Sequence, residues 1–256
     1  MNALNFIKTY GKKILLGLVA IALIAAIVFA LLTAPKTVEK PQPLQPDITY
    51  YDNPIDFAAL YAANSDVVGY IKVDGTVIDY PVYRANEQED DDFYLDHDGK
   101  KNKSVFGAIY MQRRNQADFS DRNTLLYGHC MKNGSMFAAI HKFGNQKEFF
   151  EKNRNIMIYL PDRILTYTIY AVTVTDDEHI LYKYDFETPE GTAAFIEMLQ
   201  KPSYKHQVYD GLKVTPENKF VTLSTCTSKD HERLLMVGVL TDEKHTLSAI
   251  ESLIKQ

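Results

Sequence analysis

Short runs of β-branched and aromatic residues, separated by turns, dominate the hydrophobic pattern after residue 66. One run, "VVGYIKVDGTVIDYPVY" (67–83), surrounds an Asp74-Gly75 pair, which is typical of a β-hairpin. Further strands are expected in segments of the same kind: 106–111, 123–128, 155–160, 163–174, 219–225 and 233–240. The pattern therefore predicts a mainly β domain, either a barrel or a sandwich. A closed barrel would leave no exposed strand edge.

Helical periodicity interrupts this pattern in a few places. The segment "NPIDFAALYAAN" (53–64) predicts a short helix with Asn53 as its cap. The segment "TPEGTAAFIEMLQ" (188–200) predicts a helix capped by Thr188, inserted before the strand at 219–225. A last helix is expected at the C-terminus, where three apolar residues form one stripe: Leu247, Ile250 and Ile254.

The N-terminal region has a different character. Residues 14–34 contain no charged side chain and are about as long as a helix needs to be to cross a bilayer. Lysines come just before this segment: Lys8, Lys12 and Lys13. The positive-inside tendency then places residues 1–13 in the cytoplasm and the rest of the chain outside. A cleaved signal peptide is the alternative, although the apolar stretch exceeds the usual signal core of about 7 to 15 residues.

Composition adds a linker and removes one class of partner. Residues 35–48 are rich in proline, which favours an extended spacer, and residues 49–256 have a size usually folded as one domain. The formal net charge of -5 gives no basic footprint for nucleic acid.

Cys226 is one of only two cysteines, and it stands where the predicted strand ends and the polar turn "TSKDHE" (227–232) begins. Strand ends that lead into loops are favoured positions for reactive groups. A nucleophilic thiol needs a base or a positive charge close by. Arg233 opens the next strand, so a hairpin would return it to Cys226, unless it forms a surface ion pair with Glu232 or Asp230.

His129 is the candidate base. It follows the predicted strand at 123–128, whereas the other histidines occur in polar surroundings without a local signature and are predicted to be solvated surface residues: His97, His141, His179, His206, His231 and His245.

These motifs together resemble the sortases, the membrane-anchored cysteine transpeptidases of Gram-positive bacteria. The resemblance rests on "TLSTC" (222–226), on Arg233 after it and on "YGHCMKNGSMF" (127–137) upstream, and it extends over nearly the whole exported domain. The segment "FYLDHDGKKNKSVFGAIYM" (93–111) and the predicted helices are most similar to class B.

The resemblance implies a closed eight-stranded β-barrel with added helices and a site built from Cys226, His129 and Arg233. Cys226 would cleave a Thr-Gly or Thr-Asn bond in a C-terminal sorting motif of secreted proteins, with His129 as acid and base and Arg233 at the oxyanion. The thioacyl product would pass to a peptidoglycan precursor amine, with hydrolysis as a side activity. Ser224 and Thr225 are candidate substrate contacts, and no metal or cofactor is implied.

Cys130 departs from the class B pattern, which usually has asparagine after the catalytic histidine. It leaves two alternatives: an L,D-transpeptidase-like enzyme that uses Cys130, and a Cys130–Cys226 disulfide that would silence the enzyme. A third alternative, independent of Cys130, is a non-catalytic membrane-tethered peptide-binding module. The segment "DHDGK" (96–100) matches part of an EF-hand loop, but the later glutamate is missing, so a solvated acidic surface is predicted instead of a calcium site.

Overall fold

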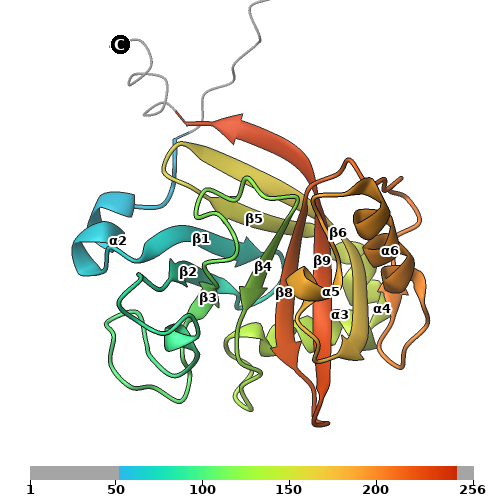
Figure 1. The fold of residues 1–256 in the computed structure, drawn as a ribbon, viewed down its shortest axis with the longest axis horizontal. Helices are drawn as coiled ribbons and strands as arrows, with labels where there is room; N and C mark the ends of the chain where they lie inside the picture. The colour runs from blue at the N-terminus through green and yellow to red at the C-terminus, as the bar shows by residue number, and fades with distance from the viewer. Residues whose placement is uncertain (1–51, 247–256) are drawn as a thin grey trace, which may run out of the picture. The chain divides into compact units, whose positions relative to one another are not determined.

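Nine strands form one continuous sheet in the computed structural model, which describes residues 52–246 (Figure 1). The strands are β1 Val67–Val73, β2 Asp79–Arg84, β3 Ile109–Met111, β4 Asn123–Tyr127, β5 Asn155–Tyr159, β6 Arg163–Asp176, β7 Gln207–Val208, β8 Phe220–Cys226 and β9 Glu232–His245. Every strand predicted from the sequence is present, and the predicted hairpin joins β1 to β2, with Gly75 at a φ of 69° in its turn. Only the two-residue strand β7 was not expected.

Pairing between β5 and β6 closes the sheet. The strand order is β5-β1-β2-β3-β4-β8-β9-β6-β7, and β5 also pairs with β6. Eight strands therefore form a closed barrel, and β7 is attached outside it along Ala171 and Val172 of β6. The register of β6 against β9 shifts near residues 166 and 170. Such irregularities bend a long strand and help it to follow a barrel wall.

The barrel interior holds one large buried cluster. All eight barrel strands contribute to this cluster. One member from each strand, in chain order, is Ile71, Val82, Ile109, Leu126, Ile158, Ile169, Val221 and Met236. Each of these side chains is at most 1% exposed, and burying one such side chain stabilises a fold by roughly 1.5 to 3 kcal/mol. The interior is thus a packed core, and the functional site must lie on the rim.

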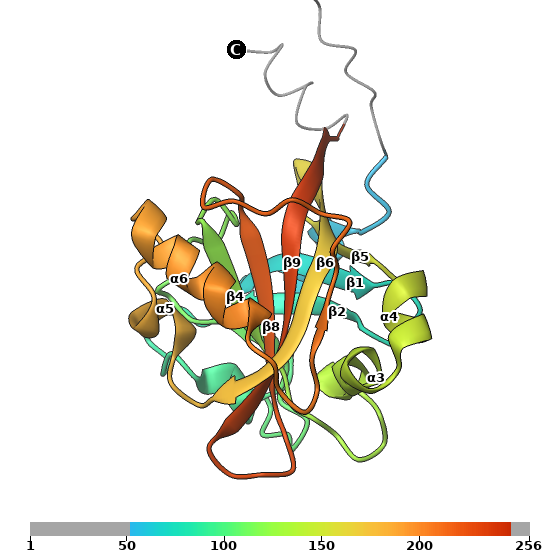
Figure 2. The same cartoon turned by 90° about the vertical axis from the view of Figure 1, so that its right-hand side faces the viewer.

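Helices cover the barrel from opposite sides (Figure 2). On one side lie α5 (Ile180–Lys183) and α6 (Pro189–Gln200), and on the other lie α3 (Ile140–Asn145) and α4 (Lys147–Lys152). The Thr188 side chain caps α6 by accepting a hydrogen bond from the Gly191 N–H (3.2 Å), as the sequence predicts. The short helices α3, α4 and α5 were not predicted.

The first described helix, α2 (Phe57–Ala63), starts later than expected. Asp56 caps it and accepts a hydrogen bond from the Ala59 N–H at 2.9 Å. The predicted cap, Asn53, instead accepts from the Ile55 N–H and donates to the Leu160 carbonyl (2.7 Å). The prediction failed because Asn53 and Asp56 are both good capping residues, and only the tertiary contact to Leu160 decides between them.

Several predicted segments lie outside the described residues. They are the cytoplasmic N-terminus 1–13, the membrane span 14–34, the linker 35–48 and the C-terminal helix around Leu247, Ile250 and Ile254. Between residues 52 and 246, no helix has the length and hydrophobicity that a membrane span requires.

Candidate active site

Two parallel strands, β4 and β8, end side by side and bring His129 to Cys226. Their register pairs Tyr127 with Ser224, so His129 and Cys226 each follow two residues later. The Gly128 N–H donates to the Ser224 carbonyl (3.3 Å), and the Thr225 hydroxyl donates to the Gly128 carbonyl (2.7 Å). These two hydrogen bonds extend the contact beyond the strand pairing and fix the two ends together.

The antiparallel pairing of β8 and β9 places Arg233 beside Cys226. The two residues are directly opposite in the register, and opposite residues of an antiparallel pair project from the same face. Arg233 donates to the Glu232 carbonyl oxygen at 3.0 Å. Within residues 52–246 its guanidinium forms no ion pair with Glu232 or Asp230, and the Glu232 carboxylate contacts Lys229 and Tyr204 instead. The alternative of a neighbouring ion pair is therefore wrong.

A cleft of about 260 Å³ is lined by Cys226, His129 and Arg233 together. Cys226 is exposed, and His129 and Arg233 are half-buried. Ser224 and Thr225 also line the cleft, but both are buried, and the Thr225 hydroxyl proton is engaged by the Gly128 carbonyl. All the residues predicted for the site thus meet at one place on the rim.

One hydrogen bond fixes the ring of His129 and another fixes its backbone. Its Nε2 lies 2.7 Å from the Leu95 carbonyl oxygen, which can only accept, so Nε2 carries the proton. In the neutral ring Nδ1 is then the unprotonated nitrogen. The backbone carbonyl of His129 accepts from the Phe137 N–H at 2.9 Å. Gly128 permits this packing, because a Cβ there would lie 2.5 Å from Ile109 Cδ1.

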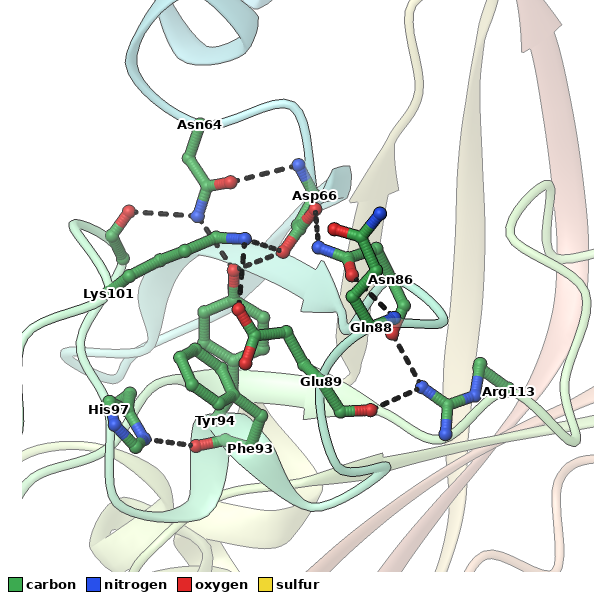
Figure 3. A network of polar contacts seen from close by, with 11 residues as sticks. Asn64, Asp66, Asn86, Gln88, Glu89, Phe93, Tyr94, His97, Lys101 and Arg113 are labelled. Atoms are coloured by element: carbon green, nitrogen blue, oxygen red, sulfur yellow. Dashed lines mark hydrogen bonds and ion pairs between the residues drawn. The ribbon is translucent and has the colours of Figure 1, made fainter.

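Leu95 comes from the long connection between β2 and β3, which a buried polar network holds in place (Figure 3). Asp66 is its centre: the Tyr94 hydroxyl donates to the carboxylate at 2.7 Å, and the Lys101 ammonium lies 2.8 Å away. Burial would raise the pKa of Asp66, but the hydrogen bonds from Lys101, Tyr94 and Asn86 outweigh it and lower the pKa. Asp66 is therefore a carboxylate at neutral pH.

The acidic segment of the same connection makes local contacts. Asp98 accepts hydrogen bonds from the Lys100 and Asn102 N–H groups, and Asp96 pairs with Lys103. Across the described residues, no group of three or more histidine, cysteine or carboxylate side chains is arranged to hold a metal ion.

Three hydrogen-bonded polar residues that no sequence pattern indicated also line the cleft: His179, Gln112 and Asp92. His179 Nε2 donates to Gln112 Oε1 (2.5 Å), and the Gln112 amide donates to the Asp92 carboxylate (2.7 Å). His179 Nδ1 accepts from the Leu181 N–H and so caps α5. Burial and the charge of Arg114 lower the pKa of His179, so the ring is neutral. The prediction that His179 is a solvated surface residue is wrong, because its ring is half-buried and contacts Gln112, after β3, and Tyr127 of β4, both far away in the sequence.

Charge on the cleft rim is balanced locally. Asp176 and Glu178 both pair with Lys183, while Asp177 accepts from His231 at 3.0 Å. The hydrogen bond from His231 lowers the pKa of Asp177, and the nearby Arg233 guanidinium lowers it further. The positive charge of Arg233 thus stabilises the carboxylate form of Asp177 at the cleft rim.

Cys130 lies next to the site with a different environment. Both cysteines are exposed and free, so the predicted alternative of a disulfide between them is not formed. Partial burial raises the pKa of the Cys130 thiol, and the nearby Cys226 raises it further. A thiol with a raised pKa is a poor nucleophile at neutral pH.

Comparison with known proteins agrees with this geometry. The family model of the sortase domain matches residues 71–241. Sortase B of Listeria monocytogenes is 35% identical over 179 residues, which cover 70% of each chain. The crystal structure of Clostridium perfringens sortase B has a TM-score of 0.64 and 29% identity, and covers 73% of this chain and 100% of that one. A Staphylococcus aureus sortase B–substrate complex has a TM-score of 0.64 and 26% identity, over 73% of this chain and 84% of that one.

Proposed function

This chain belongs to the sortase family of transpeptidases and is class B-like, and from that premise we propose that Cys226 is its catalytic nucleophile. The substrate would be a secreted protein with a C-terminal sorting motif that contains a Thr-Gly or Thr-Asn bond. The observation that carries the proposal is the shared cleft. The ends of three adjoining strands place a thiol, an imidazole and a guanidinium around it. Nucleophilic catalysis by cysteine requires such an arrangement.

In the first half of the reaction, the Cys226 thiolate attacks the threonine carbonyl carbon. The resulting oxyanion is stabilised by the Arg233 guanidinium. When the tetrahedral intermediate collapses, the C–N bond breaks, and the leaving amine takes a proton from protonated His129. Nδ1 is the nitrogen for this transfer, because Nε2 is held by the Leu95 carbonyl. The product is a thioester on Cys226.

In the second half, an amine of a peptidoglycan precursor replaces the sulfur. His129, now neutral, removes a proton from the amine as it attacks the thioester carbonyl. The C–S bond breaks, and Cys226 returns as a thiolate. Water in place of the amine would give slow hydrolysis. The transpeptidase would be held at the cell membrane by residues 14–34, with the barrel on the outer side.

Two alternatives predict different products. The chain's family does not support an L,D-transpeptidase-like enzyme acting through Cys130, and the raised pKa of that thiol also counts against it. A peptide-binding module would capture a sorting peptide without cleaving it. A solved structure of Staphylococcus aureus sortase B with its substrate supports the binding of a substrate by this fold.

A peptide-library cleavage assay tests the proposal. The intact chain should cleave peptides after threonine when Gly or Asn follows, and Cys226→Ala should cleave none of them. Cys130→Ala is the matched control, because it removes the only other thiol. Cleavage that survives in Cys226→Ala but is lost in Cys130→Ala would overturn the assignment.

A further inference from the structure

A relay of two hydrogen bonds reaches the backbone of Cys226 from α3 and from the connection between α6 and β7. His141, on α3, donates from Nε2 to the Cys226 carbonyl oxygen at 3.2 Å. Lys205, in the connection between α6 and β7, donates from Nζ to His141 Nδ1 at 2.6 Å. The proton positions are fixed by chemistry, because a carbonyl can only accept and an ammonium can only donate.

The relay determines the form of His141. Burial lowers the pKa of His141, and the Lys205 charge lowers it further. The ring is therefore neutral at neutral pH, with its single proton on the nitrogen that faces Cys226. The prediction that His141 is an ordinary surface histidine is wrong for this reason.

The segment that carries Lys205 is itself attached at several points. Ser203 accepts from the Val174 N–H of β6 at 3.0 Å. Tyr204 donates to the Glu232 carboxylate at 2.6 Å, next to Arg233 on β9. Lys205 also packs against α3, since a Cβ at Gly144 would lie 3.1 Å from its own Cβ. One short segment thus contacts β6 and β9 directly and the end of β8 through His141.

We propose that His141 and Lys205 are positioning residues for the nucleophile. The Cys226 carbonyl belongs to the last residue of β8, where the chain leaves the sheet for the loop. Fixing that carbonyl fixes the orientation of the Cys226–Thr227 peptide, and hence the direction in which the thiol projects. Lys205 acts one step further away, by keeping the proton of His141 on Nε2.

The proposal rests on Cys226 being the nucleophile and is tested on the full-length chain with the peptide that it cleaves fastest. His141→Leu removes the donor, and Lys205→Met removes the ammonium but keeps most of the stem that packs on α3. His141→Gln returns an N–H donor to about the place of Nε2. Lys142→Met is the matched control on α3, because the Lys142 ammonium lies over the Phe149 ring of α4 and, among residues 52–246, Lys142 does not line the cleft.

We expect His141→Leu and Lys205→Met to lower kcat about three- to tenfold, the range that one net hydrogen bond covers. KM should stay within about twofold, because substrate contacts are unchanged. His141→Gln should recover most of kcat, and Lys142→Met should match the parent.

Two results would overturn the proposal: a His141→Leu enzyme as fast as the Lys142→Met control, or a His141→Gln enzyme as slow as His141→Leu, which would indicate packing alone. If His141→Leu melts below the assay temperature, Lys205→Met decides in its place. Failure of the proposed function is distinguishable, because it would appear as cleavage that persists in Cys226→Ala.

Discussion

At the scale of single residues, the position of Arg233 allows its catalytic and structural roles to be separated. Arg233 lies opposite Cys226 and is half-buried. Within residues 52–246 its guanidinium forms no ion pair, so removing it would leave no buried carboxylate unpaired. Arg233→Ala should therefore leave the unfolding midpoint nearly unchanged. Acylation by a sorting peptide should slow by about 10² to 10³, which is about 2.7 to 4 kcal/mol of barrier.

Arg233→Lys provides the control, since it keeps the charge but loses the planar set of donors. Its acylation rate, measured in single-turnover reactions, should fall between those of Arg233→Ala and the parent. A near-native rate in Arg233→Ala would contradict the oxyanion role.

The residues of the site differ in how visible they are in the sequence. Cys226, His129 and Arg233 could be found because each stands at the end of a strand with a distinct pattern, and because the three motifs together resemble one family. His179, Gln112 and His141 could not, since their roles depend on partners tens of residues away. Leu95 contributes only a backbone carbonyl, which no side-chain motif reports.

At the scale of elements, the connection between β2 and β3 should respond to pH through Asp66. Its pKa is lowered in the folded chain, so the carboxylate contributes stability at pH values above the unfolded pKa of about 3.9. This contribution is lost as the pH falls through the folded pKa. Asp66→Asn should thus destabilise the fold at pH 7 by about 1.5 to 3 kcal/mol, because hydrogen bonds to a charged group are lost.

The measurement is urea unfolding of Asp66→Asn and the parent from pH 7 to pH 3. The difference between them should shrink below about pH 4. Asp98→Asn is a comparison in the same connection, because hydrogen bonds from the Asn102 and Lys100 N–H groups also lower the pKa of Asp98 but in an exposed turn, so its difference should change in the same direction and be smaller. A difference that stays constant down to pH 3 would show that the charge of Asp66 does not stabilise the fold.

Secondary-structure elements were predictable where their patterns are long. The strands of the barrel and α6 follow from alternation, β-branched residues and a Thr-Pro start. Helices α3, α4 and α5 have four to six residues each, too few for a period to show, and they form because tertiary contacts hold them. The start of α2 was misplaced for a similar reason.

At the scale of the whole molecule, closure of the barrel is the feature that local patterns could not supply. Alternation of apolar residues predicts many strands but not their order, and the pairings of β1 with β5 and of β6 with β9 join segments far apart in the chain. The eight-stranded barrel was expected only through the family resemblance. The parallel pairing of β4 with β8, on which the site depends, has the same long-range origin.

Membrane attachment is a prediction for the chain that includes residues 14–34. The full-length protein should remain in the membrane pellet after washing with high salt or alkaline carbonate and should require detergent for extraction. Deletion of residues 14–34 should release it, since these residues supply the apolar length for a span. A full-length chain that salt alone extracts would contradict an integral span.

The proposed transpeptidase reaction requires a thioester at Cys226. Intact-mass and peptide-mapping spectrometry should be performed after incubation with a peptide that contains a cleavable Thr-Asn or Thr-Gly bond. The expected mass increase equals the peptide fragment that ends in threonine less one water, because the acyl group replaces the thiol hydrogen. It should lie on Cys226, be sensitive to hydroxylamine, be present in Cys130→Ser and be absent in Cys226→Ala. An adduct on Cys130, or peptide turnover in Cys226→Ala, would contradict it.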